Sequence, residues 1–119
     1  MTLLTDLAVA LVAALHLYFL TLEMFFWERP LGLRTFKLTP EFAHASRTLA
    51  ANQGLYNGFL AAGLTWGILL GSDGLQIEIF FLLCVIIAGV FGALTVSKKI
   101  FYVQALPAAV SLILIFLIY

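Results

Sequence analysis

Two ionisable side chains inside the first apolar stretch of the sequence are the residues best suited to chemistry. Glu23 and His16 are seven residues apart, so a helix presents both on one face, within about 20° of each other. A carboxylate and an imidazole in this arrangement can transfer a proton or orient a polar ligand. We therefore predict Glu23 and His16 as the catalytic residues if the protein is an enzyme.

A second group of polar side chains opens another apolar stretch, "RTLAANQGLYNGFLAAG". On a helix, Asn52 and Tyr56 form one strip, and Gln53 and Asn57 form an adjoining one. Lipid cannot satisfy such groups, so they need protein partners or a ligand. The predicted ligand-binding residues are Arg47, Asn52, Gln53, Tyr56 and Asn57 from this stretch, with Trp27 and Gln104 from two others.

The same residues also have purely structural roles open to them. Glu23 can pair with Arg47 or Lys99 near the membrane surface, and His16 can be a buried imidazole bonded to Asn57 or to a backbone carbonyl. Amide side chains can bridge helices, with each bridge contributing about 1 kcal/mol. The sequence is compatible both with these structural roles and with ligand binding.

The composition indicates a membrane protein. Of the 119 residues, 64% are hydrophobic and 10% are charged, and the mean hydropathy is +1.13. Soluble domains are about one quarter charged, and a soluble chain this short could not bury so much apolar surface. The formal net charge is zero, so nothing indicates nucleic-acid binding. The single cysteine excludes an intramolecular disulfide.

The elements that position these residues are expected to be membrane-spanning helices. A span needs about 20 mostly apolar residues, and closed barrels would need many short alternating segments. The predicted spans are residues 4–26, 48–70, 77–96 and 100–119. The expected fold is therefore an all-α, four-helix polytopic bundle that forms one membrane domain over residues 1–119. Thr39 as a cap, Pro40 at the first helical position and Glu41 in the first turn predict that the second helix begins near residue 40.

The basic residues predict the orientation of the chain. All six lie in the loops 27–47 and 97–99, so the positive-inside rule places both loops in the cytoplasm and both termini outside. The N-terminus lacks the features of a cleaved signal peptide, and we expect a multi-pass protein of the plasma (inner) membrane. In this orientation the candidate polar side chains lie in the cytoplasmic half of the membrane. The outer half is expected to contain almost no polar side chains.

The stretches "HLYFLTLEMFFW", "TPEF" and "AANQGLYNGFLAAGL" resemble a family of small bacterial four-span membrane proteins catalogued as a domain of unknown function. The resemblance covers nearly the whole chain. It implies that the family-pattern positions are His16, Glu23, Trp27, Pro40, Glu41, Asn52, Gln53, Gly54, Tyr56, Asn57 and Gly58. An acidic residue often precedes the histidine in that family, whereas Leu15 stands here. The resemblance implies no activity.

Three functions fit these observations. The first is a polar pocket in the cytoplasmic half that binds or transforms a small or amphiphilic molecule, with Arg47 as an anion contact. The second is a small transporter or proton-coupled permease, and the third is a non-catalytic accessory subunit. The expected partners are the lipid bilayer and, because of the glycine-rich helix faces, further copies of the chain. The cofactor and substrate stay open, and we predict no metal site because His16 and Glu23 alone are too few ligands.

Overall fold

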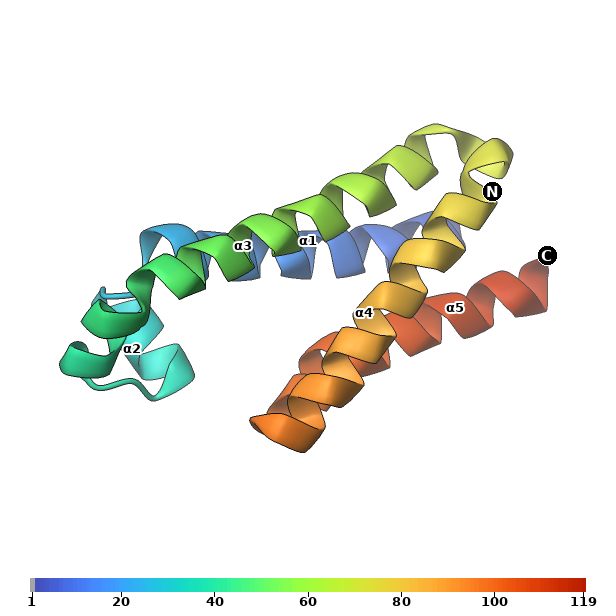
Figure 1. Ribbon diagram of the computed structural model, residues 1–119. Coiled ribbons are helices and arrows are strands. Elements are labelled where there is room, and N and C mark those ends of the chain that lie inside the picture. Colours follow the sequence, from blue (N-terminus) through green and yellow to red (C-terminus); the bar gives the residue numbers. More distant parts are fainter. Residues whose placement is uncertain (1) are drawn as a thin grey trace. The chain divides into compact units, whose positions relative to one another are not determined.

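A computed structural model describes residues 2–119, and every regular element in that range is helical (Figure 1). The elements are α1 (Leu3–Phe25), α2 (Pro30–Phe36), α3 (Pro40–Leu69), the 3₁₀ turn η1 (Gly71–Gly74), α4 (Leu75–Thr95), the π-helical turn η2 (Phe101–Ala105) and α5 (Leu106–Ile118). The predicted all-α class is confirmed. The chain divides into two compact units, one built from residues 2–15 and 60–119 and the other from residues 16–59.

Three helical segments within residues 2–119 are long and apolar enough to cross a membrane. They are Leu3–Phe25, Gly71–Thr95 and Phe101–Ile118, which supports the prediction of a membrane protein. The helix α3 is the longest of all, with 30 residues, but its many polar side chains leave it outside this set. The prediction of a fourth span is therefore not confirmed.

The unit of residues 16–59 contains the end of α1, the whole of α2 and the beginning of α3. The predicted start of α3 at Pro40 is confirmed, because Thr39 caps it: the Thr39 hydroxyl accepts the backbone N–H of Phe42 at 3.2 Å. The short helix α2 was not predicted within the loop 27–47. Pro30 at its first position favours its start, and a seven-residue helix gives too little periodicity for sequence analysis to detect.

The end of α2 places a lysine in a conformation that suits glycine. Lys37 has φ 55° and ψ 48°, and its backbone N–H binds the carbonyl of Leu33. This left-handed conformation costs an L-residue about 1–2 kcal/mol. We expect Lys37→Gly to raise the free energy of unfolding by about 0.5–1 kcal/mol, measured by denaturant titration in detergent micelles. Arg34→Gly, inside α2, is the matched control and should lower it by about 1 kcal/mol.

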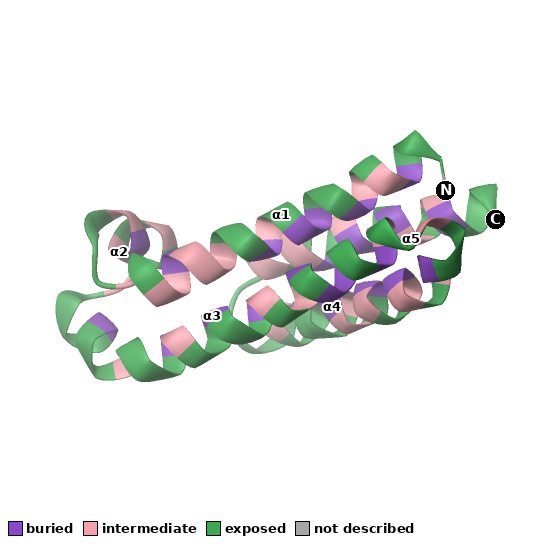
Figure 2. Ribbon diagram, turned by 90° about the horizontal axis from the view of Figure 1, so that it is seen from above, coloured by how far each residue is buried: buried purple, intermediate pink, exposed green. Residues whose placement is uncertain are grey.

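The hydrophobic core lies in the other unit. Its buried side chains come from α1, α3, α4 and α5 and are Val9, Val12, Ala13, Ala61, Leu64, Leu82, Val85, Ala108 and Ile115. Figure 2 shows buried residues recurring along one side of these helices, and the remaining residues of each helix are partly or fully exposed. The exposed side chains are themselves largely apolar, as expected for helices that contact lipid.

Two tight connections shape this unit. A glycine makes the turn after α3 possible, because Gly71 adopts φ 62°, a conformation that L side chains rarely take. Farther along, η2 forms the beginning of the last apolar segment and ends two residues before Pro107. The N–H of Leu106 donates to the carbonyl of Phe101. Proline lacks the N–H that a regular helix would use at this point, which gives a local reason for the wider turn. Gly89 of α4 packs on Ala105, the last residue of η2, so closely that a Cβ at Gly89 would lie 2.6 Å from the Ala105 nitrogen.

Candidate functional site

The centre of the candidate site is a hydrogen bond between α1 and α3 within the unit of residues 16–59. The Asn57 amide donates to a carboxylate oxygen of Glu23 at 2.5 Å, and Asn57 is only 4% exposed. Close helix contact makes this bond feasible, because a Cβ at Gly54 would lie 2.7 Å from a Met24 carbon. Gly58 packs in the same way on Leu20. The glycine face of α3 therefore brings a carboxylate and an amide together.

Glu23 also lines an open cleft of about 430 Å³. The cleft residues come from the end of α1, the segment after it and the first half of α3, and they are Glu23, Met24, Phe25, Trp27, Glu28, Arg29, Arg47, Thr48 and Ala51. The walls combine apolar side chains with two acidic and two basic ones. Such a lining suits a molecule that has an apolar body and a charged or zwitterionic head.

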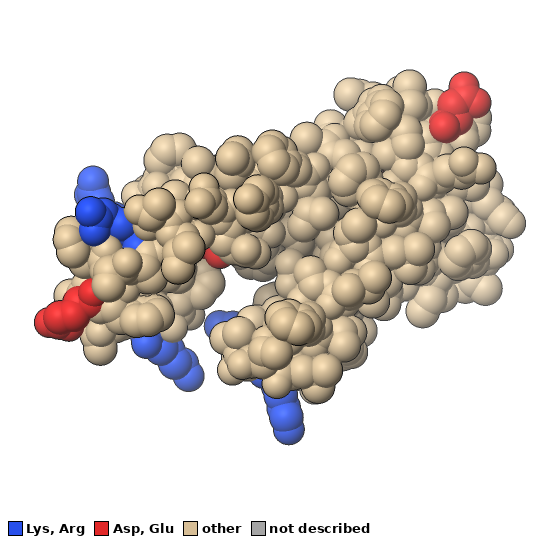
Figure 3. All heavy atoms as spheres, viewed as in Figure 1, with Lys and Arg blue, Asp and Glu red and all other residues tan. Residues whose placement is uncertain are grey.

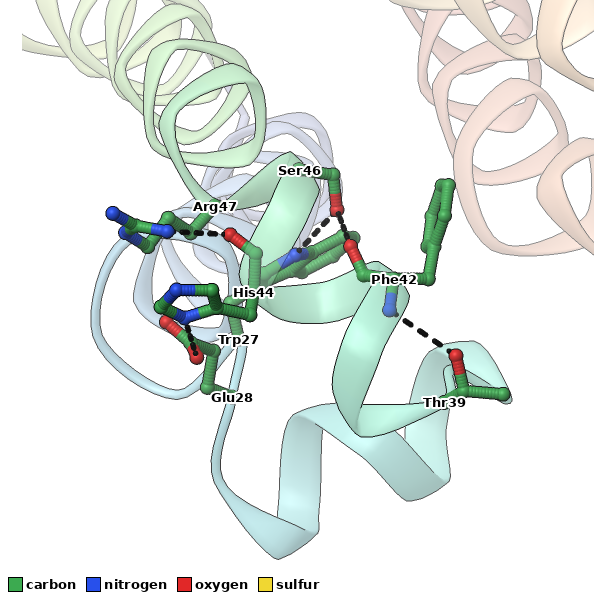
Figure 4. Close-up of polar contacts among 7 residues, drawn as sticks. All are labelled: Trp27, Glu28, Thr39, Phe42, His44, Ser46 and Arg47. Carbon is green, nitrogen blue, oxygen red and sulfur yellow. Dashed lines mark hydrogen bonds and ion pairs between the residues drawn. The ribbon is translucent and has the colours of Figure 1, made fainter.

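Trp27 forms one wall of this cleft and is fixed from two directions. Its indole N–H donates to the Ser46 hydroxyl at 3.1 Å (Figure 4), and the Ser46 hydroxyl donates to the carbonyl of Phe42 at 2.7 Å. The Trp27 ring also packs against the Phe36 ring of α2, with centroids 5.0 Å apart. A rigid indole with its N–H already bound offers a ligand chiefly an apolar edge.

Charged side chains are part of the cleft lining, and two of them, Glu28 and Arg47, bind His44. Glu28 pairs with His44 at 3.0 Å, and both side chains are well exposed, so the pair adds at most about 1 kcal/mol to stability. Arg47 uses one guanidinium nitrogen to donate to the carbonyl of His44 at 2.7 Å (Figure 4). That bond holds the Arg47 side chain beside Glu28 and His44, with further N–H groups left for an anion. Elsewhere, the face drawn in Figure 3 is mostly uncharged.

Comparison with known proteins places this site in a family. Residues 10–116, which include the whole cleft, match the family model described as "Protein of unknown function (DUF1304)". The chain belongs to the DUF1304 family. It is 36% identical over 115 residues to the "Uncharacterized protein YpaA" of Lactococcus lactis subsp. lactis (strain IL1403), an alignment that covers 95% of this chain and 97% of that protein. No solved structure matches.

The DUF1304 match confirms the resemblance that the sequence motifs indicated, and the structure brings part of the predicted site together. Glu23, Trp27 and Arg47 line the cleft, and Asn57 binds Glu23. The roles of these residues in binding or catalysis stay predictions. His16 is fully buried and makes an edge contact with Phe19, and it does not line the cleft.

The remaining predicted residues of this DUF1304 protein lie elsewhere. Asn52, Gln53 and Tyr56 are exposed on α3, and Tyr56 has 57% of its surface accessible. Gln104 belongs to η2 in the other unit, where it is half-buried. Within residues 2–119 no group of three or more His, Cys, Asp or Glu side chains is placed to hold a metal ion.

The unit of residues 2–15 and 60–119 contains buried polar side chains that are not among the predicted site residues. Glu78 near the start of α4 is fully buried, as are Thr5 and Ser111 in the same unit. The sequence did carry a signal, because Glu78 is an acidic residue within the third predicted span, as Glu23 is in the first. An acidic residue in a span is costly and suggests a function, and this argument applies to Glu78 as it does to Glu23.

Proposed function

We propose that this DUF1304 protein is an integral membrane protein whose cleft beside Glu23 binds an amphiphilic molecule. The observation that carries the proposal is the cleft lining, in which Glu23 and Arg47 lie with the apolar side chains of Met24, Phe25 and Trp27. The carboxylate and the guanidinium would bind a polar head that carries both a donor and an acidic group. The apolar side chains would hold the chain or ring next to it.

The proposed membrane arrangement keeps four spans. At about 1.5 Å per residue, the 30 residues of α3 reach roughly 45 Å, long enough to cross the hydrocarbon core and extend beyond it. In this arrangement the loops 27–47 and 97–99, which hold all six basic residues, face the cytoplasm from the plasma membrane, and both termini face outward. The cleft would then open toward the cytoplasm or the inner leaflet.

Glu23 has the geometry of a general base or an orienting acceptor. One of its oxygens is held by Asn57, and its side chain lines the cleft. An anchored carboxylate on a cleft wall can accept a proton or a hydrogen bond from a ligand without reorganising. If the protein transforms its ligand, Glu23 would carry that chemistry. His16, which is buried away from the cleft lining, would then act at most through its neighbours.

The test is co-purification of ligand with variants of Glu23. The full chain is extracted in a mild detergent and analysed by native mass spectrometry, and any bound molecule is identified after release. Glu23→Gln retains an acceptor for Asn57 but lacks the charge, so we expect at least a tenfold loss of bound ligand with unchanged folding. Glu41→Gln makes the same change at an exposed residue outside the cleft lining and should retain the ligand. Equal occupancy in Glu23→Gln and Glu41→Gln would overturn the proposal.

An accessory, self-associating role is the second candidate, and one observation favours it. Asn52, Gln53 and Tyr56 are exposed on a helix that the proposed arrangement places in the membrane, where lipid cannot satisfy amide or phenol groups. Amides both donate and accept, so a second copy of the chain could satisfy this strip. Loss of the oligomer in Asn52→Leu/Gln53→Leu, with ligand still bound, would separate this role from the cleft.

A further inference from the structure

Glu78 lies in a setting that leaves its carboxylate without a protein partner. The residue is 0% exposed, and neither of its carboxylate oxygens has a hydrogen-bond partner among the described residues. A buried carboxylate in this state is strongly unfavourable unless a positive charge neutralises it. The cleft of Glu23 does not account for Glu78, because the two residues belong to different compact units.

The neighbours of Glu78 show that its burial is built into the helix packing. A Cβ at Gly67 would lie 2.5 Å from the Glu78 Cγ, so the side chain passes directly over a glycine of α3. Gly74, at the end of η1, is packed just as tightly on the Gly67 backbone. Because these two glycines have no side chains, they leave room for the aliphatic part of the Glu78 side chain. Any larger residue at position 67 would displace that side chain.

A second acidic side chain is close enough to interact with Glu78 electrostatically. Asp6, in the first turn of α1, repels Glu78. Asp6 also has one buried oxygen without a hydrogen-bond partner among residues 2–119. The start of α4 adds a favourable helix dipole at Glu78, but this effect is smaller than the cost of burying a carboxylate next to another acid.

We propose that Glu78 and Asp6 form a site for one small positive charge, carried by a proton or by an alkali-metal ion. Three carboxylate oxygens without protein donors are the ligands that such a charge prefers. The site belongs to the unit that also holds the hydrophobic core. It is therefore distinct from the proposed amphiphile cleft and does not depend on that proposal.

The test uses an apolar carbodiimide on the full chain in detergent micelles, in a choline buffer free of alkali ions. A protonated carboxyl group that is shielded from water adds its O–H across a C=N bond of the reagent. The resulting O-acylisourea rearranges to a stable N-acylurea that peptide mass spectrometry locates. We expect Glu78 to be labelled at least tenfold faster than Glu41, an exposed glutamate of α3. Sodium or potassium chloride is then added, with choline chloride as the control for ionic strength.

Each outcome decides the question. Labelling that neither salt slows identifies the ligand as a proton, and labelling that one salt slows tenfold identifies that alkali-metal ion. In the second case, Asp6→Asn should abolish the protection while leaving Glu78 reactive, because it removes one of the two negative charges that hold the ion. If Glu78 stays unlabelled in the folded chain at every pH from 5 to 9 but is labelled after unfolding, groups of the protein neutralise it and the proposal fails.

Discussion

Asn57→Leu is expected to lower the free energy of unfolding by about 2–3 kcal/mol, because it leaves the Glu23 carboxylate without its donor. Asn57 is nearly fully buried and binds Glu23 directly, and a hydrogen bond to a charged group contributes about 1.5–3 kcal/mol. The leucine has a similar volume, so the loss reports the hydrogen bond rather than a cavity. Unfolding is followed by circular dichroism during titration of a mild detergent with sodium dodecyl sulfate.

Asn52→Leu is the matched control for this prediction. It makes the same change on the same helix at an exposed position. In a monomeric preparation, where no second copy covers Asn52, it should shift the free energy of unfolding by no more than about 0.5 kcal/mol. In a Glu23→Leu background, Asn57→Leu should also lose most of its effect, because the carboxylate that needs a donor is gone. Equal losses for the two asparagine variants would show that the Glu23–Asn57 bond is not what stabilises this unit.

The second large effect is expected at Gly89, where α4 meets η2. Gly89→Leu should lower the free energy of unfolding by about 3 kcal/mol, because its Cβ would lie 2.6 Å from the Ala105 nitrogen and 2.7 Å from the Ala105 Cβ. The contact on one side is backbone, which cannot move aside as a flexible side chain would. The same detergent titration measures the loss.

Ala88→Leu is the control, since Ala88 is the neighbouring residue of α4 and is exposed. We expect this variant to fold with unchanged stability, because its larger side chain faces the surroundings of the helix. If Gly89→Leu and Ala88→Leu are equally stable, the close packing of α4 on η2 does not hold in the folded protein.

The extents of the helices could be predicted because they follow from apolar length and from a few local signals. The N-cap Thr39 and Pro40 define the start of α3, and Gly71 defines the turn that follows it. The seven residues of α2 and the π-helical turn η2 could not be predicted. Both are too short to leave a periodic pattern, and the effect of Pro107 on hydrogen bonding has more than one structural solution.

The composition of the candidate site was predictable in part. Sequence spacing gives the depth of a residue along a helix. It places Asn52 at the depth of Glu23, and Asn57 between the depths of Glu23 and His16, whereas the residue that binds Glu23 in the structure is Asn57. Sequence spacing does not give the rotation of a helix toward its neighbour. The structure turns the face of α3 that carries Gly54, Asn57 and Gly58 toward α1. Asn52, Gln53 and Tyr56 are left on exposed surface.

The burial of Glu78 likewise depends on how its helix is rotated toward the neighbouring helices. The sequence marks Glu78 only as an acidic residue within a predicted span, and a glutamate in the first turn of a helix is common and favourable. Only the packing on Gly67 reveals that this side chain is enclosed rather than solvated. Such burial depends on contacts between different helices. A local sequence pattern does not show which helices pack together.

The turn η2 has a consequence for how the length of this chain can vary. A π-helical turn holds one residue more than the α-helical turn it replaces, so it is equivalent to a one-residue insertion within Phe101–Ala105. A relative without a proline at position 107 could delete that residue and still direct Ala108, Ser111 and Ile115 toward the interior. In an alignment of such relatives, a single-residue gap before position 106 should coincide with the loss of the proline.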